Sequence, residues 1–352
     1  MKKFYYLELL RFFTALSVLI MHYQHFFKPH SSLSTLDYEK SKTLQPFYSN
    51  LEVFYNFGHL GVQMFWAISG FVFAFVYLEQ EKKISINKFF VNRLARLYPL
   101  HFATLIAVLL LQIVSLKLAG EFQIYKFNDL YHFFLQIFFI SGWGFENGYS
   151  FNAPIWSVSI EILVYILFFF SITYLNKYNV KYVLLIYIFL LFIDKFNLIT
   201  NVKFASFLLI DCAKLFFSGV LVFYIYNFFN KKIYLLFISI LLIFLSFLGN
   251  FKLFLFFPSL LLFFLSLELF ILNSFKKPFQ ILGNLTYAIY LLHIPIQISF
   301  ILIFNQFNIF NEVFFNNYFF IFYIFFMMSL SYICFRFYEK PLNNKIRSFF
   351  LR

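Results

Sequence analysis

The chain has 352 residues, of which 62% are hydrophobic and 12% are charged, with a formal net charge of +13. A soluble globular domain contains roughly 25% charged residues, and no water-soluble core could bury the 63 phenylalanines of this chain. The composition therefore excludes a soluble enzyme and indicates a polytopic membrane protein. We expect no nucleic-acid partner, because no soluble basic domain is present to form a binding groove.

Ten apolar segments approach the roughly 17–25 residues that a helix needs to cross a bilayer. They cover residues 7–27, 57–78, 98–118, 155–175, 182–196, 204–229, 233–249, 253–272, 285–304 and 316–337. A further run, 129–142, is shorter and ends in Ser-Gly-Trp-Gly, so we expect a re-entrant or interfacial helix there. The sequence thus predicts an all-α transmembrane bundle of about ten spanning helices.

The basic residues orient this bundle, since cytoplasmic loops carry an excess of Lys and Arg. If both termini are cytoplasmic, 18 of the 28 Lys and Arg residues fall on the cytoplasmic side and 8 on the other, while Arg11 and Lys214 lie within spans. The net positive charge then sets the orientation of the chain in the membrane and attracts anionic lipid headgroups. We expect one transmembrane domain over residues 1–352, without a separate periplasmic domain.

The first apolar segment carries ionisable side chains that a bilayer disfavours. Arg11 and His22 are about three helical turns apart and share one face, roughly 16 Å from each other along the axis. Glu8 can pair with Arg11 from the neighbouring turn. His22 can be a functional imidazole or a hydrogen-bonded interfacial histidine, and Arg11 can be a snorkelling interfacial arginine. His25, closer to the surface, is expected to be interfacial.

The next two segments add a hydroxyl and a pair of guanidinium groups. In GHLGVQMFWAISGF the glycines suit close helix packing, and Ser69 is a weaker nucleophile candidate. In FVNRLARLYPL, Arg93 and Arg96 are three residues apart, so two guanidinium forks project together and suit a diphosphate. A positive-inside anchor would satisfy the same pattern.

Three later segments carry further polar groups. Glu161, in APIWSVSIEILVY, lies at about the depth predicted for His22 and could orient that imidazole or form a structural polar contact. Asp211 and Lys214 are expected to neutralise each other. His293 precedes Pro295, so it can be a core histidine bonded to a carbonyl that the proline opens, or a lining or catalytic residue.

The two cysteines, Cys212 and Cys334, lie inside apolar runs without ligand-like spacing to histidine. We expect two small buried side chains, without a metal site.

Six motifs in order resemble the acyltransferase-3 family of integral-membrane O-acyltransferases. They are Arg11 and His22 with ten residues between them, GHLGVQMFWAISGF, FVNRLARLYPL, APIWSVSIEILVY, LGNLTYAIYLLHIPI and FRFYEKPL. The resemblance extends from Leu7 to Leu342. Two positions depart from the family pattern: Ile162 follows Glu161 where the family usually has Glu or Gln, and Gln63 replaces an acidic residue.

The resemblance implies transfer of an acyl group, commonly acetyl, from cytoplasmic acyl-coenzyme A to a hydroxyl on an extracytoplasmic glycan or lipid-linked sugar. By analogy, Arg93 and Arg96 bind the coenzyme A phosphates and His22 is the catalytic base, with Glu161 as its partner. Arg11, Glu8, Ser69 and His293 would support or line the site. Acyl-coenzyme A is then a co-substrate rather than a permanently bound cofactor.

The expected location is the bacterial inner membrane, and the oligomeric state stays open, a homodimer included. Two other classes remain as alternatives: a transporter or flippase of polysaccharide intermediates, and a structural membrane subunit. A transporter moves its cargo whether or not coenzyme A binds, whereas an acyltransferase changes the mass of the acceptor.

Overall fold

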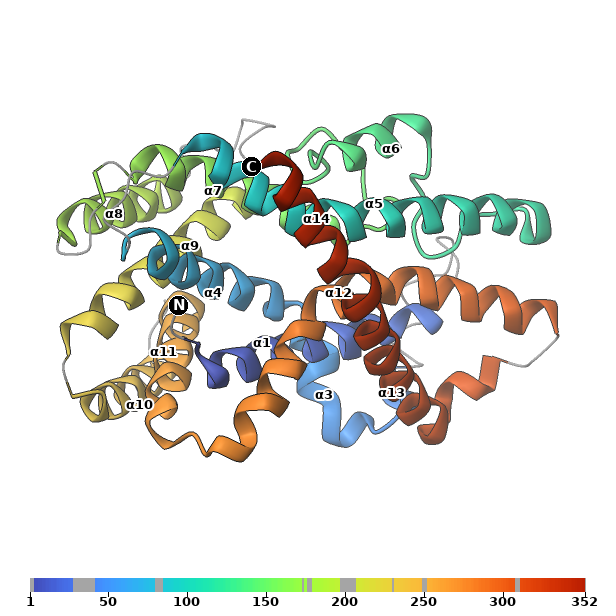
Figure 1. Ribbon diagram of the computed structural model, residues 1–352. Coiled ribbons are helices and arrows are strands. Elements are labelled where there is room, and N and C mark those ends of the chain that lie inside the picture. Colours follow the sequence, from blue (N-terminus) through green and yellow to red (C-terminus); the bar gives the residue numbers. More distant parts are fainter. Residues whose placement is uncertain are drawn as a thin grey trace. The chain divides into compact units, whose positions relative to one another are not determined.

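The computed structural model describes residues 3–27, 42–79, 85–172, 174–175, 179–196, 207–229, 231–248, 252–307 and 311–351. These residues form helices and no strand (Figure 1). The helices are α1 (Tyr5–His22), α3 (Tyr48–Phe57), α4 (Leu60–Tyr77), α5 (Ile86–Ala119), α6 (Leu130–Ile137), α7 (Ile155–Ser171), α8 (Lys181–Lys195), α9 (Phe207–Phe228), α10 (Ile233–Leu248), α11 (Lys252–Leu267), α12 (Asn273–Gln306), α13 (Asn317–Cys334) and α14 (Lys340–Phe350).

Each of the ten predicted apolar segments overlaps one of these helices, which confirms the all-α polytopic bundle. Among the described residues, seven helical stretches are long and apolar enough to cross a membrane, and they include α1, α4, α5, α9, α11, α12 and α13. Helices α7 and α10 are apolar but shorter. The predicted limits at residues 204–206 and 249 lie outside the described residues.

The ends of several helices follow from local capping. Ser85 accepts a hydrogen bond from the Lys88 amide and begins α5, which ends at Gly120 with φ +76°, a conformation that favours glycine. Asp129 caps α6 in the same way through the His132 amide. The Asn316 side chain accepts from the Tyr318 amide and begins α13.

The chain divides into two compact units that interleave along the sequence. Unit 1 comprises Met1–Thr14, Leu60–Ile84 and Ser157–Gly283, and unit 2 comprises Ala15–His59, Ser85–Trp156 and Asn284–Arg352. Helices α4 and α8–α11 belong to unit 1, whereas α3, α5, α6, α13 and α14 belong to unit 2. Helices α1, α7 and α12 contribute residues to both.

Unit 1 is built around the pair α4 and α9, which pack against each other. A Cβ placed on Gly70 would lie 1.8 Å from the Phe216 carbonyl oxygen, and one on Gly219 would lie 1.9 Å from that of Ala67. Only glycine permits this approach, in agreement with the packing role predicted for Gly70. The aromatic rings of Phe73, Phe168 and Phe216 fill the space beside the pair.

Unit 1 also buries Lys214 of α9, whose side chain is 1% exposed. Its ammonium lies 2.8 Å from Asp211, which confirms the predicted pair, and 2.8 Å from Asp194 of α8. The ring of Phe254 lies 3.8 Å from the same ammonium. Two carboxylates therefore compensate the buried cation, as a charge at membrane depth requires.

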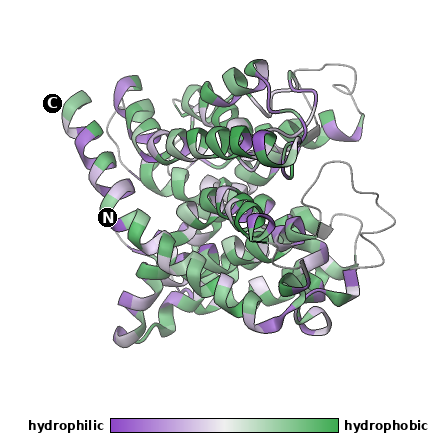
Figure 2. Cartoon of the chain, turned by 90° about the vertical axis from the view of Figure 1, so that its right-hand side faces the viewer, coloured by the Kyte–Doolittle hydropathy of each residue, from purple (hydrophilic) through white to green (hydrophobic). Residues whose placement is uncertain are grey.

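In unit 2, α14 packs against α5 and follows a π-helical turn, Phe335–Glu339. Hydrophobic and hydrophilic residues alternate along this C-terminal helix, whereas most other helices are hydrophobic over nearly their whole length (Figure 2). One prediction is wrong nearby, since Cys334 at the end of α13 is partly exposed while Cys212 is buried. The neighbours Tyr332 and Ile333 are exposed as well. An apolar side chain facing lipid needs no burial in protein.

Candidate active site

Three histidine rings lie together in unit 2. The ring centroid of His22, the last residue of α1, is 4.7 Å from that of His293 on α12 and 5.0 Å from that of His25. His293 is completely buried, and the side chains of His22 and His25 are partly buried. His25 was expected to be interfacial, and the structure adds its imidazole to the group.

Backbone carbonyls fix the tautomers of two of these rings. The Nδ1 of His22 lies 3.0 Å from the Val18 carbonyl oxygen, and the Nδ1 of His293 lies 3.2 Å from that of Ile289. A carbonyl oxygen only accepts, so both Nδ1 atoms carry the proton and both Nε2 atoms present a lone pair. The Nε2 of His293 is buried without a hydrogen bond to any described residue.

Gln297 connects this group of histidines to the end of α1. Its Nε2 donates to the His22 carbonyl oxygen at 2.9 Å, which orients the amide so that its Oε1 accepts from His25 Nδ1 at 3.2 Å. The side chain is fully buried. Gln297 was not among the predicted site residues, although it follows His293 by one helical turn and so shares its face.

The proline after His293 leaves a backbone carbonyl of α12 free to bind a side chain from another segment. Pro295 lacks an amide hydrogen, so the carbonyl of Leu291, one turn earlier, has no helical donor. The Nδ2 of Asn152 donates to this oxygen at 3.0 Å and to Thr104 Oγ1 at 2.9 Å. Of the two interpretations left open for His293, a bond to the carbonyl opened by the proline does not hold, because Asn152 donates to that carbonyl and His293 Nδ1 donates to the Ile289 carbonyl.

A buried polar face of α5 holds the segment that contains α6. His101 Nε2 donates to the Gln136 carbonyl oxygen at 2.8 Å, and Gln112 Nε2 donates to the Gln123 carbonyl oxygen at 2.9 Å. His101 and Gln112 are about 16 Å apart along the helix axis. Residues 120–154 therefore run along α5 for that length and return at Thr104. This path is compatible with both forms expected for residues 129–142, a re-entrant helix and an interfacial one.

The same helix connects the two predicted arginines to the histidines. Arg93 and Arg96 are both half-buried on α5. Thr104, which contacts Asn152 and through it Leu291, lies about 12 to 16 Å farther along the helix axis. Leu291 is two residues from His293. Within unit 2, the two arginines and His293 are thus connected through α5, Asn152 and the Leu291 carbonyl.

The remaining predicted residues lie in unit 1. Arg11 Nη1 forms the predicted ion pair with Glu8 Oε2 at 2.8 Å. Glu8 also packs on Gly283 of α12, where a Cβ would lie 2.0 Å from the same carboxylate oxygen. Ser69 of α4 is half-buried, and Glu161 of α7 is buried. His22 belongs to unit 2, so its pairing with Glu161 stays a prediction.

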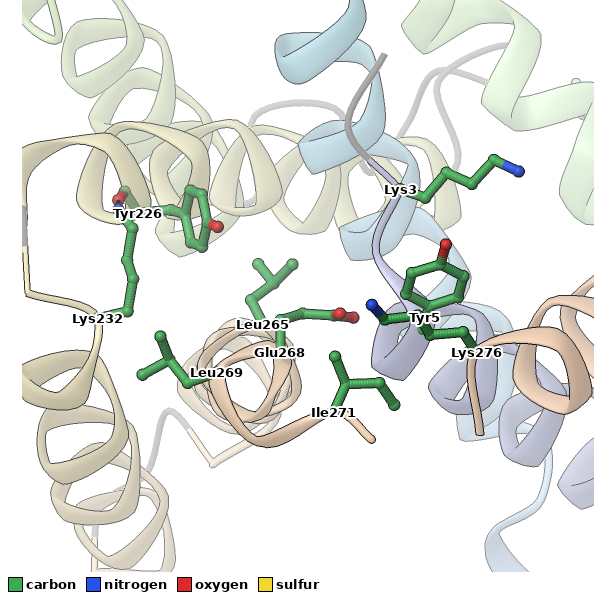
Figure 3. A pocket seen from close by; sticks show the side chains of 9 residues that line it. All are labelled: Lys3, Tyr5, Tyr226, Lys232, Leu265, Glu268, Leu269, Ile271 and Lys276. Atoms are coloured by element: carbon green, nitrogen blue, oxygen red, sulfur yellow. Dashed lines mark hydrogen bonds between the residues drawn. The ribbon is translucent and has the colours of Figure 1, made fainter. Parts of the chain in front are cut away.

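Unit 1 also contains a cavity of about 230 Å³ (Figure 3). It is lined by Lys3, Tyr5, Tyr226, Lys232, Leu265, Glu268, Leu269, Ile271 and Lys276. Glu268 accepts a hydrogen bond from the Tyr6 amide at 2.5 Å, and Lys276 donates to Asn273 at 2.7 Å. None of the residues predicted for catalysis or donor binding lines this cavity.

Comparison with known families gives one match. The model of the acyltransferase domain family covers residues 4–336, which is nearly the whole chain. Neither the curated proteins nor the solved structures contain a match to this sequence. The matched range includes both arginines of α5 and all three histidines.

Proposed function

The chain belongs to the acyltransferase domain family, and from this premise we propose that it transfers an acyl group, commonly acetyl, from acyl-coenzyme A to a sugar hydroxyl. The acceptor is a glycan or a lipid-linked sugar on the outer side of the bacterial inner membrane. The family and the apolar helices identify the protein as an integral-membrane acyltransferase, and the donor and the acceptor are our proposal.

One observation carries the proposal: the Nδ1 of His22 is bound to the Val18 carbonyl, so its Nε2 lone pair is available as a base. No described residue forms a hydrogen bond with this atom. An imidazole held in one tautomer beside a buried second imidazole is suited to taking a proton from a hydroxyl group.

The two arginines of α5 support the choice of donor. Arg93 and Arg96 offer two planar guanidinium groups that can bind phosphate oxygens in pairs. A pantetheine arm is long and thin, and it would run along α5 from the phosphates toward His22. The polar side chains of Thr104 and Asn152 lie on that route.

We propose direct transfer in a single chemical step. The acceptor hydroxyl loses its proton to His22 Nε2 while its oxygen attacks the thioester carbonyl carbon. The new C–O bond forms, the C–S bond breaks, and the coenzyme A thiolate leaves and takes the proton from the imidazolium. Among the described residues, no serine side chain forms a hydrogen bond with His22.

Two groups could stabilise the imidazolium that forms. The Nε2 of His293 can accept a hydrogen bond from it, and Glu161 is the carboxylate predicted from the sequence. His293→Gln and Glu161→Gln separate these roles, because each keeps the approximate shape of the side chain. The variant that loses more activity while still binding acyl-coenzyme A identifies the supporting group.

The test of the function is a comparison of glycans by mass spectrometry. Cells with the gene should contain a glycan that is heavier by one acyl group, and cells without the gene, or with His22→Ala in its place, should lack it. A glycan that moves across the membrane without any change in mass would contradict the proposal and favour the transporter. Labelled enzyme, isolated after incubation with acyl-coenzyme A alone, would overturn the direct step.

A further inference from the structure

The segment between α5 and α6 carries a tyrosine that contacts the histidines. The ring of Tyr125 lies edge-on to that of His25, with centroids 5.6 Å apart and planes at 79°. The ring of Tyr149 lies 6.0 Å from the same Tyr125 ring. Tyr149 is 55% exposed, so the two rings lead from the outside of unit 2 to the histidines.

The fold fixes the position of Tyr125 through its neighbour Gln123. The Gln123 amide donates to Gln112 Oε1 at 2.9 Å, and Gln112 Nε2 donates back to the Gln123 carbonyl. Ser115 accepts from Gln123 Nε2 at 3.0 Å. The backbone amide, the backbone carbonyl and the side chain of Gln123 are therefore all bound to α5, and this side chain is fully buried.

Ile124, which lies between Gln123 and Tyr125, has a strained backbone. Ile124 has φ +64°, which a β-branched side chain rarely adopts. Such strain persists only where the surroundings hold the backbone in place, and it concentrates at functional sites. Here the Gln112–Gln123 pair holds it, and the turn at Ile124 brings the Tyr125 ring against His25.

The hydroxyl groups of the two tyrosines are available to a ligand. Neither one forms a hydrogen bond with a described residue. Burial raises the pKa of Tyr125 above its usual range. The pKa of Tyr149 is also raised, mainly by burial and to a smaller extent by the negative charge of the nearby Glu146. Both hydroxyls therefore stay protonated and can donate.

The charges around these rings indicate a neutral ligand. The segment 120–154 contains no arginine, and its one lysine, Lys126, lies 5.8 Å from the Phe127 ring centroid. A phosphate group would find no cluster of cations in this segment. A sugar ring, in contrast, has an apolar face for aromatic packing and hydroxyls for polar contacts, which matches rings with a polar end.

We propose that Tyr125 and Tyr149 form the acceptor subsite, binding a neutral hexose or N-acetylhexosamine ring so that one of its hydroxyls faces the histidines. This inference rests on the proposed function, because it names the acceptor's chemistry at the same site. Tyr125 is then the inner contact and Tyr149 the outer contact of the sugar.

Saturation-transfer NMR on the purified protein in nanodiscs tests this subsite. The probes are methyl β-glucoside and methyl N-acetyl-β-glucosaminide. Wild-type protein should give a signal from at least one glycoside, and Tyr125→Ala and Tyr149→Ala should each weaken its binding by about three- to tenfold. Tyr318→Ala is the matched control, since this tyrosine of α13 is 83% exposed and far along the chain from the segment.

Tyr125→Phe guards against a folding defect, because it keeps the ring and removes only the hydroxyl. It should bind the glycoside more weakly than wild type and more tightly than Tyr125→Ala. Acyl-coenzyme A affinity should be unchanged in all four variants. No glycoside signal in the wild type, or equal signals in the wild type and Tyr125→Ala, would overturn the subsite.

The two proposals can fail separately. If the protein acylates sugars and Tyr125→Ala leaves the KM for the acceptor unchanged, the function stands and the subsite fails. If the glycoside binds through Tyr125 but cells with and without the gene contain identical glycans, the subsite stands and the acyltransfer to sugars fails.

Discussion

Helices α4 and α9 of unit 1 meet through glycine, whereas α5 of unit 2 holds residues 120–154 through amides, a hydroxyl and an imidazole. Both contacts are buried. At Gly70 and Gly219 the nearest atoms across the contact are backbone atoms of the facing helix. At His101, Thr104 and Gln112 each contact is a specific hydrogen bond to a carbonyl or an amide.

The glycine contact between α4 and α9 belongs to the scaffold of the protein, whereas the hydrogen bonds of α5 belong to the candidate site. Backbone packing through small residues gives a rigid helix pair but offers no group that reacts. Buried hydrogen bonds hold the irregular backbone of residues 120–154 along α5, with Tyr125 against His25 and Asn152 at the Leu291 carbonyl. We therefore expect changes in the glycine contact to affect stability, and changes along α5 and the histidines to affect binding and rate.

The largest effect should come from the glycine contact. In Gly70→Val or Gly219→Val the new side chain would overlap a carbonyl oxygen, so the helices must separate at a cost of at least about 3 kcal/mol. Membrane extracts should contain less folded protein than those of the wild type, and the protein that remains should unfold at a lower temperature. Ser69→Ala is the control on the same helix and should unfold normally. A stable Gly70→Val variant would show that the helices are not in contact there.

The donor site gives the next largest effect. Arg93→Ala and Arg96→Ala should each weaken acyl-coenzyme A binding by about 10- to 100-fold in calorimetry, because each removes charged hydrogen bonds to phosphate. Arg→Lys variants should recover only part of the lost affinity. High salt should reduce the difference in affinity between the wild type and the alanine variants. Lys88→Ala, an exposed lysine at the start of α5, should bind normally. Unchanged affinity in the double arginine variant would reduce the pair to a topology signal.

A smaller effect tests the contact between Asn152 and the proline kink. Asn152→Leu leaves the Leu291 carbonyl without a donor and should lower the free energy of unfolding by about 1–3 kcal/mol. Pro295→Ala restores an amide hydrogen to the helix, so the double variant should recover about 1 kcal/mol of this loss. Strictly additive effects in thermal unfolding would mean that Asn152 does not serve this carbonyl.

The smallest effect concerns pH. Burial raises the pKa of Glu146 from 4.5 to about 7, so the folded protein binds this proton more tightly than the unfolded chain does. Stability should be greatest below pH 4.5 on account of this group, and should fall as the pH rises to about 7. Glu146→Gln should flatten that part of the profile. A profile identical to wild type would show that Glu146 titrates normally.

The sequence predicted most of the fold and part of the site. Hydropathy alone located the ten helices, because a bilayer imposes one length and one composition on each span. The pairs Glu8–Arg11 and Asp211–Lys214 were predictable because residues three apart on a helix face each other. His22 was singled out by the cost of an ionisable group in a membrane, Arg93 and Arg96 by a spacing that suits a diphosphate, and all three by the family resemblance.

The remaining site residues depend on contacts between distant segments. Gln297, Asn152 and Tyr125 are uncharged, so neither composition nor periodicity distinguishes them. The role of Asn152 requires knowing that residues 120–154 return along α5, and that of Tyr125 requires the unusual backbone at Ile124. The one sequence signal was Pro295, which indicated an open carbonyl but not its partner.

The central claim is that His22 is the base, and single-turnover acyl transfer by the purified protein tests it most directly. His22→Ala and His22→Gln should transfer the labelled acyl group about 10²–10⁴-fold more slowly than the wild type, with acyl-coenzyme A affinity and thermal unfolding unchanged. A wild-type rate in either variant would remove His22 from the chemistry.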